Sequence, residues 1–253
     1  GSEAQRDENV QQVAIVGERS GLYNSGNDNT FVGHEAGRNS GAGTGQVFLG
    51  NNAGYADTAS GDIAIGEQAM YAGPTGGGNY AIGRYSMMDA NAGSTSLSSN
   101  SNIAIGQSAM GGTWADAASN YNIAIGHYSM DAALNGALNN VAIGYNALTG
   151  LTSGDNNIAI GTQVMQSLTT GGSNVVIGRA AGDAHTALEG TVLIGHFAGS
   201  AINNNNSNYS VMIGYSAGQA VTSGIGNNLI GYYAGRYLST NGYNTMFGTE
   251  TGA

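Results

Sequence analysis

The sequence predicts an all-β fold, a β-solenoid of about 14 coils built from one repeated unit. Three observations indicate it. A short apolar triplet followed by glycine recurs fourteen times, these glycines are most often 17 residues apart, and glycine supplies 44 of the 253 residues. β-branched triplets bounded by turn-forming residues are typical of strands. A helical repeat would need apolar positions at 3.6-residue spacing and far fewer glycines.

Each repeat is expected to form one coil with two short strands and two corners, as in the triplet Ile103–Ile105 before Gly106. Longer steps of 23 and 20 residues follow Gly83 and Gly106 and predict inserted loops there. Strands of successive coils should stack about 4.8 Å apart. The anchoring glycines, in chain order, are Gly17, Gly33, Gly50, Gly66, Gly83, Gly106, Gly126, Gly144, Gly161, Gly178, Gly195, Gly214, Gly231 and Gly248.

The repeats begin near Val13 and reach the last residue, so residues 13–253 are expected to form a single repeat domain. Residues 1–12 are expected to be a tag remnant and an N-terminal lead-in, because Gly1 and Ser2 resemble a cloning scar.

Composition excludes several partners and cofactors. The net charge is −10 with only six Lys and Arg, so the chain lacks the basic surface that nucleic acid requires. No apolar run approaches 18 residues, so no membrane insertion is expected. The chain has no cysteine, which excludes disulfides and thiolate metal sites.

The residue four places before the anchoring glycine is asparagine in nine repeats, among them Asn79, Asn102 and Asn122. Asparagine tolerates left-handed backbone and suits a corner. Stacked asparagine side chains can also form a hydrogen-bonded ladder. Both interpretations remain open from the sequence.

Two positions exchange volume between repeats. In six consecutive repeats the residue two before the glycine is Ala and the residue four after it is Met or Leu; in the other eight, the first is bulky and the second is Gly. Because close-packed interiors keep summed volume nearly constant, the two positions should share one packed space. Residues expected in core or subunit packing are Ala104, Ala124, Ala142, Met110, Met130, Phe31, Phe48 and Leu193.

Both faces of the strands are expected to be apolar, because the residues one and three before the glycine are mostly Ile and Val and the residue two before it is always apolar. Alternate residues of a strand point to opposite faces, so both faces should be covered. The coil interior covers one, and another copy of the chain is expected to cover the other.

The strings "NIAIGQSAM", "NIAIGHYSM" and "NVAIGYNAL" resemble the head repeat of YadA-like trimeric autotransporter adhesins. That resemblance implies a left-handed parallel β-roll, three copies of which pack about one axis as a homotrimer. Repeats such as "NTFVGHEAG" resemble those of surface fibres and phage-type tail fibres. The repeats here are a few residues longer than typical head repeats, and no neck or stalk motif is visible. Both resemblances imply that the chain is extracellular, at a bacterial cell surface or in a virion fibre.

No catalytic, metal or cofactor site is expected. Three of the four histidines, His34, His127 and His196, follow anchoring glycines directly, where other repeats carry Glu, Arg, Tyr, Gln or Thr. Carboxylates are scattered, whereas a glycosidase needs a defined pair in one cleft.

The sequence favours an exposed ligand-binding surface over a catalytic site. The two residues after each glycine should project from a corner, and many are aromatic. Amphipathic rings are favoured binding anchors, and long loops on rigid scaffolds tend to hold functional residues. A ligand patch is predicted at Trp114, Tyr121, Tyr85, Tyr128 and Tyr145. The loop "INNNNSNY" from Ile202 is a second candidate.

These patterns predict a non-enzymatic, homotrimeric fibre or adhesin head that binds a surface glycan or protein of a target cell. A spacer segment of a bacterial or phage fibre is one alternative. A polysaccharide-degrading enzyme is another.

Overall fold

The computed structural model describes residues 13–91, 98–202 and 208–252. Those residues form a parallel β-solenoid of about 13 turns without an α-helix, which confirms that the fold is an all-β solenoid. The chain divides into two compact units, Gly1–Gly136 (unit 1) and Ala137–Ala253 (unit 2), and each is described by itself.

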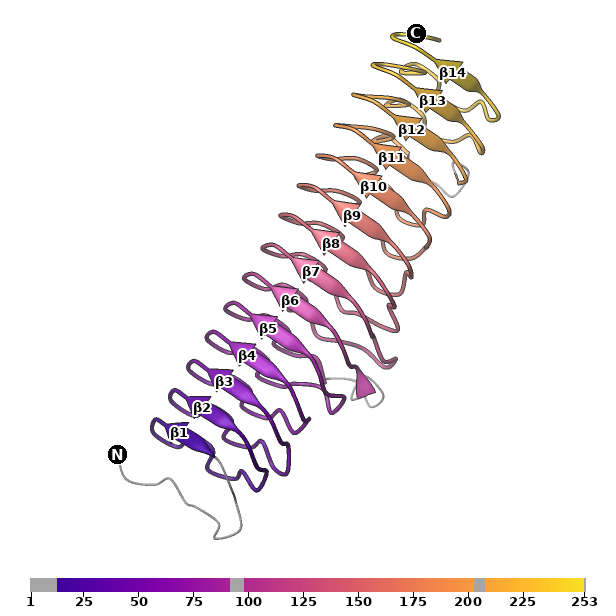
Figure 1. Cartoon of the computed structure of the whole chain (residues 1–253). Coiled ribbons are helices and arrows are strands. Elements are labelled where there is room, and N and C mark those ends of the chain that lie inside the picture. Colours follow the sequence, from indigo (N-terminus) through magenta and orange to yellow (C-terminus); the bar gives the residue numbers. More distant parts are fainter. Residues whose placement is uncertain (1–12, 92–97, 203–207, 253) are drawn as a thin grey trace. The chain divides into compact units, whose positions relative to one another are not determined.

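Unit 1 stacks its strands in chain order, and each strand pairs in parallel with the next. The register keeps equivalent repeat positions side by side, so Ala104 lies opposite Ala124. In Figure 1 these strands run from indigo to magenta. They are β1 (Ala14–Val16), β2 (Thr30–Val32), β3 (Val47–Leu49), β4 (Ile63–Ile65), β5 (Tyr80–Ile82), β6 (Ile103–Ile105) and β7 (Ile123–Ile125).

Unit 2 repeats this arrangement with parallel pairing in chain order. Its register is also strict, since Val176 lies opposite both Ala159 and Leu193. Its strands are β8 (Val141–Ile143), β9 (Ile158–Ile160), β10 (Val175–Ile177), β11 (Val192–Ile194), β12 (Val211–Ile213), β13 (Asn228–Ile230) and β14 (Thr245–Phe247).

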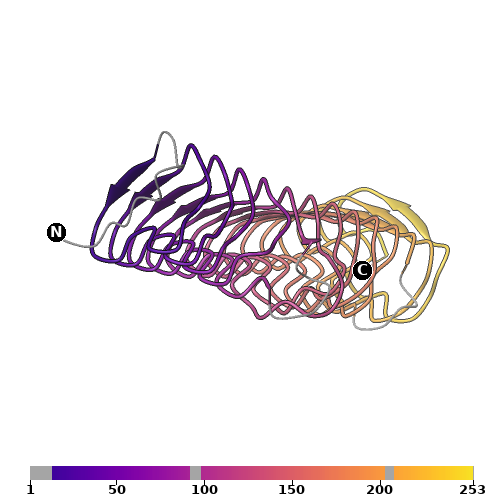
Figure 2. The same ribbon diagram turned by 90° about the horizontal axis from the view of Figure 1, so that it is seen from below.

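Each described coil has one regular strand of three residues rather than the expected two. Elsewhere the coil consists of turns, joined to the next coil by backbone hydrogen bonds and by the isolated bridges Asn24–Gly41, Ala72–Asp89 and Thr170–Ala187. Figure 2 shows that within each unit the strands lie along one side of the coils and the turns return along the other.

The middle residue of each strand points into the coil. All eight residues predicted in core or subunit packing have fully buried side chains within a single chain (Ala104, Ala124, Ala142, Met110, Met130, Phe31, Phe48 and Leu193). They are therefore core residues and present no surface to a second copy of the chain.

The predicted volume exchange is confirmed. A Cβ placed on Gly37 would lie 2.8 Å from three carbons of the Phe31 ring, so the ring fills the space that Met occupies in other coils. The position also has left-handed backbone, and the six non-glycine residues there adopt φ values of 44° to 51° (Met70, Met87, Met110, Met130, Leu148 and Met165). Each coil thus fills one interior volume either from its strand or from its opposite turn.

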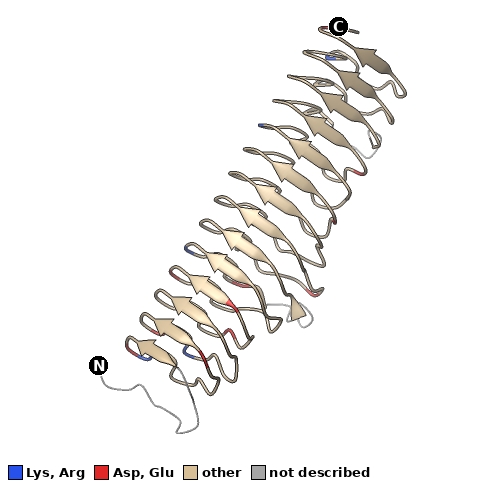
Figure 3. Cartoon of the chain, in the orientation of Figure 1, with Lys and Arg blue, Asp and Glu red and all other residues tan. Residues whose placement is uncertain are grey.

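The apolar residues one and three before the glycine form the outward face of the sheet. Ile65, Ile82 and Ile105 are 37–38% exposed, and Val16 is 62% exposed. The strands contain no charged residue, and the charged residues coloured in Figure 3 lie outside the strands. The apolar surface that a second copy could cover is therefore this Ile and Val face.

The asparagine four before the glycine forms a buried ladder, so the ladder interpretation is confirmed. The Asn102 side-chain amide donates to Asn79 Oδ1 at 3.1 Å, and the Asn122 amide donates to Asn102 Oδ1 at 3.2 Å. In unit 2, Asn174 donates to Asn157 Oδ1 at 2.8 Å. Each ladder oxygen also accepts the backbone N–H of the next coil, as Asn102 Oδ1 does from Asn122. These bonds satisfy polar groups that would otherwise be costly to bury.

The anchoring glycine is required by contact as well as by backbone conformation. All fourteen have φ between 122° and 142°. A Cβ on Gly66 would lie 2.6 Å from the carbonyl oxygen of Gly83 in the next coil. No other residue type has both this conformation and this close approach at low cost.

Candidate functional site

Trp114, the centre of the predicted patch, lies in the core. Its side chain is 1% exposed, and its indole N–H donates to the Met110 carbonyl oxygen at 3.2 Å. Its backbone N–H donates to the Asp89 carbonyl at 3.0 Å. The inserted segment turns the ring inward, so Trp114 offers no surface to a ligand.

The predicted tyrosines lie at the surface. Tyr121 is 59% exposed and Tyr145 is 50% exposed, while Tyr85 and Tyr128 are half-buried. The Arg84 guanidinium lies 5.0 Å from the Tyr85 ring centre, and Gln107 donates to the Tyr128 hydroxyl at 3.4 Å. Tyr145 belongs to unit 2 and the other three to unit 1. Without Trp114, the four rings do not make up the patch that was predicted.

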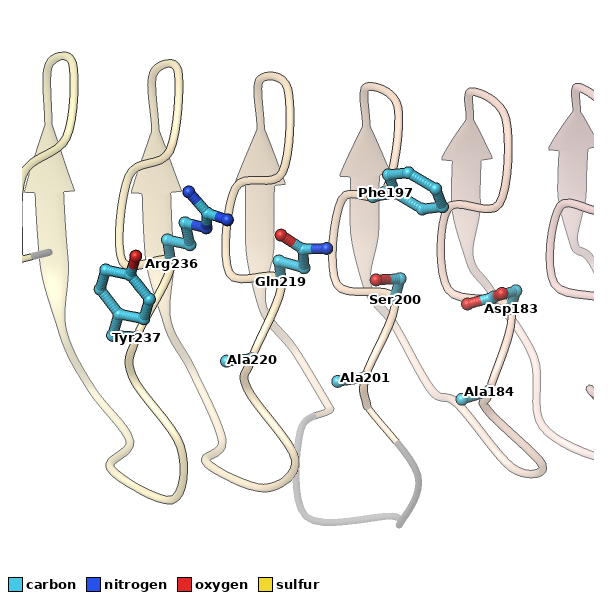
Figure 4. A pocket seen from close by; sticks show the side chains of 9 residues that line it. All are labelled: Asp183, Ala184, Phe197, Ser200, Ala201, Gln219, Ala220, Arg236 and Tyr237. Atoms are coloured by element: carbon cyan, nitrogen blue, oxygen red, sulfur yellow. The ribbon is translucent and has the colours of Figure 1, made fainter.

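Unit 2 has an open groove of about 530 Å³ on its turn side, drawn in Figure 4. It spans four successive coils and is regular, because two repeat positions supply most of its lining. The fifth residue after the glycine gives a polar row, and the sixth gives a row of mostly alanine. The lining residues are Asp183, Ala184, Phe197, Ser200, Ala201, Gln219, Ala220, Arg236 and Tyr237.

Alanine makes the groove hollow, because Ala184, Ala201 and Ala220 place only a methyl group where Tyr237 places a ring. The floor is held by backbone bonds between coils. Ala201 N–H donates to the Gln219 carbonyl and Ala220 N–H donates to the Arg236 carbonyl, both at 3.1 Å. The groove therefore exists without a ligand, as most binding sites do.

An aromatic strip lies beside the groove at the corner of the same coils. His196 stacks on Phe197 with ring centres 4.0 Å apart, and Tyr215 stacks on Tyr232 at 5.6 Å. Tyr233 meets Tyr215 edge-on at 5.4 Å. Tyr215 and Tyr232 are 41% and 47% exposed, and Tyr237 at the groove end is 65% exposed. Exposed rings gathered in this way are typical of recognition surfaces.

Both arginines of unit 2 contact this aromatic surface. Arg179 Nη1 lies 2.9 Å from His196 Nε2, and its guanidinium lies 5.6 Å from the Phe197 ring centre. Arg236 lies 4.2 Å from the Tyr233 ring centre and 5.3 Å from that of Tyr237. Among the residues that the structure describes, neither arginine has a carboxylate within ion-pair distance.

The far end of the groove is acidic. Burial raises the pKa of Asp183, while backbone N–H groups of Asp183 and Ala184 oppose that rise. Gln219 and Ser200, between Asp183 and Arg236, form no side-chain hydrogen bond within the described ranges. One edge of the groove is therefore lined by a carboxylate, a hydroxyl, an amide and a guanidinium, each able to form further hydrogen bonds.

Sequence reasoning missed this groove, although a signal was present. The sixth residue after the glycine is alanine in three consecutive coils of unit 2, and the fifth is polar in the same coils. A comparison of those two columns along the repeat would have indicated a hollow edged by polar groups. The loop from Ile202 proposed as a second candidate falls mostly on residues 203–207, outside the described residues.

Among the described residues, no helix is long and apolar enough to cross a membrane. The same residues contain no group of three His, Cys, Asp or Glu placed to hold a metal ion. No protein-family model, curated protein or solved structure matches the chain.

Proposed function

We propose that the chain is a non-enzymatic, homotrimeric fibre or adhesin head module of the bacterial cell surface or of a virion. In this proposal three left-handed β-rolls pack through the outward Ile and Val face, and their turns present aromatic residues to a glycan or protein of a target cell. The number three and the left-handed sense come from the resemblance to YadA-like head repeats.

The observation on which the proposal depends is the uncovered apolar face. Strands about 4.8 Å apart and residues about 3.3 Å apart give the seven strands of one unit a flat face of about 330 Å². The largest apolar patch on a typical monomer is about 300–600 Å² and is often functional, so a face of this size supports an interaction surface. The face is continuous because each outward residue lies beside its equivalent in the next coil, as Ile103 lies beside Ile123. A second copy with the same row offers a matching surface.

Molar mass in solution tests the assembly. Light scattering should give three times the 25.4 kDa of one chain. Ile105→Lys introduces a charge in the outward face and should dissociate the trimer. Gln107→Lys introduces the same charge two residues further along, at the corner, and should leave the trimer intact. A stable, soluble monomer of the unchanged chain would overturn the homotrimer.

Binding tests the adhesive role. The whole chain applied to glycan arrays and to intact bacterial and host cells should be retained by a defined subset. A trimer that binds none of them would favour the spacer alternative. Release of reducing ends from bacterial polysaccharide would favour the enzyme alternative.

A further inference from the structure

We propose that the groove of unit 2 binds an acidic oligosaccharide, with a sugar carboxylate at Arg236 and sugar rings along the alanine floor. The inference rests on the proposed adhesive function and deepens it, because it names the site and the ligand chemistry. The geometry that supports it is the row of Asp183, Ser200, Gln219 and Arg236 across four coils (Figure 4).

Arg236 is an arginine held in place without an acidic partner. Its guanidinium lies over Tyr233 and Tyr237, and the described residues place no carboxylate within ion-pair distance of it. A guanidinium offers paired donors that match a planar carboxylate, and stacking on rings lowers the entropy lost on binding. A carboxylate is therefore the ligand group that this end of the groove fits best.

In unit 1 the arginine at the same repeat position is paired with an acidic residue. Arg38 is also the fifth residue after its glycine, but its Nη1 lies 3.1 Å from Glu35 Oε1 and 2.9 Å from the Tyr55 hydroxyl. The chain thus satisfies this arginine internally in one unit and leaves Arg236 available in the other. The difference favours a ligand at Arg236 over a general structural role for the position.

The polar row fits sugar hydroxyls. Equivalent positions of successive coils are about 4.8 Å apart, so the row from Asp183 to Arg236 spans about 14 Å. Along it lie a carboxylate, a hydroxyl and an amide, which can each accept or donate to a hydroxyl. The Ser200 hydroxyl and the Gln219 amide have no hydrogen bond to lose within the described residues when a ligand arrives.

The apolar surfaces fit the C–H faces of sugar rings. Ala184, Ala201 and Ala220 form a shallow floor, while Phe197 stands on one side and Tyr237 closes the Arg236 end. Rigid rings supply contact area with little loss of side-chain freedom. A flat, narrow ligand with polar edges and apolar faces suits this combination.

Asp183 determines which end of the oligosaccharide lies at each end of the groove. A second acidic sugar at that end would meet a carboxylate that is already partly desolvated, so a neutral sugar that donates hydroxyl hydrogens fits there. A polyanion such as nucleic acid is disfavoured by the same group and by the net charge of −10. The expected order is one acidic sugar at Arg236 followed by neutral sugars toward Asp183.

Calorimetric titration of the whole chain tests the site. The probes are an oligosaccharide of alternating glucuronic acid and N-acetylglucosamine, a sialylated trisaccharide, the carboxyl-reduced form of the first probe, and an Asp- and Glu-rich peptide. We expect binding of at least one carboxylated sugar and at least tenfold weaker binding of the reduced form, since charge-assisted bonds contribute that much. The two acidic sugars distinguish a uronic acid from a sialic acid.

Two matched variants locate the site. Arg236→Gln should weaken binding of the carboxylated sugar about tenfold or more. Arg38→Gln, at the same repeat position in unit 1, should leave the affinity unchanged. Thermal unfolding of Arg236→Gln should be unchanged, because the guanidinium contacts the half-buried Tyr233 ring and the exposed Tyr237 ring and forms no ion pair in the described residues. The loss of affinity then reflects the ligand contact.

Any of the following results would overturn the inference: equal binding by Arg236→Gln, equal binding of the carboxyl-reduced probe, or preference for the acidic peptide. No binding of either acidic sugar would also overturn it, and retention on other glycans or on cells would then leave the proposed adhesive function standing. Failure of the whole chain to bind any array or cell would instead overturn the proposed function.

Discussion

The two units share one repeat and differ in what they bury at the seventh residue after the anchoring glycine. Unit 2 has an apolar row there, Leu151, Leu168 and Val221, interrupted by His185. The first three coils of unit 1 have a buried polar row, Asn24, Ser40 and Asp57.

The unit 1 row is connected to the buried ladder, because the Asn29 side-chain amide donates to Asn24 Oδ1 at 2.9 Å. Within the row, Ser40 donates to the same oxygen at 3.2 Å. Asp57 there lies against Asp62, which takes the place of a ladder asparagine. The same interior position therefore tolerates opposite chemistries, provided that the neighbouring coils supply matching groups.

Because unit 1 buries carboxyl groups and unit 2 buries a histidine, the stabilities of the two units should respond to pH in opposite directions. Burial, and then the charge of Asp62, raises the pKa of Asp57, and burial raises the pKa of Asp62 to about 6. Their folded pKa values exceed the unfolded value of 3.8, so unit 1 loses stability as pH rises from about 4 through 6. Burial raises the pKa of Asp131 to about 6 and adds to this trend.

Burial lowers the pKa of His185 to about 4, and neither ring nitrogen has a hydrogen-bond partner in the described structure. The unfolded histidine titrates near 6.5. The contribution of the neutral, buried His185 to the stability of unit 2 is therefore complete above pH 6.5 and is lost as pH falls toward 4. The raised pKa of Asp183 opposes it in part. Amide exchange, corrected for its intrinsic pH dependence, should show unit 1 weakening and unit 2 strengthening between pH 4.5 and 7.

The largest expected effect concerns the volume exchange. Gly54→Met places a Cβ within 2.6 Å of Phe48 Cγ at a φ of 58°, and should destabilise unit 1 by about 4 kcal/mol or more. Gly182→Met in unit 2 should cost less, because a Cβ there lies 3.8 Å from the Val176 side chain and 2.9 Å from Leu193 Cδ1. Thermal unfolding of the two variants measures the difference.

A double variant isolates the shared volume. Phe48→Ala alone should cost about 3–5 kcal/mol, whereas Phe48→Ala with Gly54→Met converts the coil to the Ala and Met type and should recover most of the loss. Additive losses in the double variant would contradict the shared space.

The second prediction concerns His185. Replacement of His185 by Leu restores the apolar row of unit 2 and should remove an acid sensitivity worth about 3 kcal/mol between pH 6.5 and 4. Unfolding of the variant should depend much less on pH in that window, and exchange in unit 1 should not change. An undiminished acid transition would show that other groups cause it.

The third prediction concerns the acid pair of unit 1. Asp62→Asn gives the ladder its usual residue and should stabilise unit 1 by about 2 kcal/mol at pH 7, with little effect at pH 3.5. The control Asp116→Asn changes the same residue type at an exposed position of unit 1 and should alter stability by less than about 0.5 kcal/mol. Destabilisation by Asp62→Asn at pH 7 would mean that both carboxyl groups of the Asp57–Asp62 pair are required for the stability of unit 1.

The smallest effect is expected from the ion pairs. Glu35 contacts Arg38 at 3.1 Å and Arg19 at 3.3 Å, and these are the ion pairs found in the described residues. Glu35→Gln should cost unit 1 less than about 1 kcal/mol and make its stability less dependent on salt. A larger loss would show that Glu35 has a packing role beyond its charge.

The sequence predicted the fold because every level of the repeat agrees. The β-branched triplets, the invariant glycines and the reciprocal sizes of Phe48 and Gly54 all indicate stacked coils. The direction of the strand faces was not predicted, because both faces are apolar and alternation alone does not identify the inner one. The interior proved to hold the Ala row, since Met from the opposite turn completes the volume.

The candidate site was poorly predicted for a related reason. Trp114 lies in an inserted loop, which suggested exposure, but it stands eight residues after its glycine, as buried Leu134 does after Gly126. Alignment by that offset would have placed Trp114 in the core. The groove depends on two columns of side chains from four coils, and single motifs along the chain do not reveal such columns.

The close contact between successive anchoring glycines also bears on how such proteins change over generations. Within each unit, every anchoring glycine except the last meets the backbone of the glycine in the following coil, as Gly66 meets Gly83, and this contact involves backbone atoms alone. A coil with the glycine can therefore follow another, provided that the buried groups of the two coils match. Duplication or loss of whole coils should be tolerated in the gene, with each event lengthening or shortening the stack by about 4.8 Å.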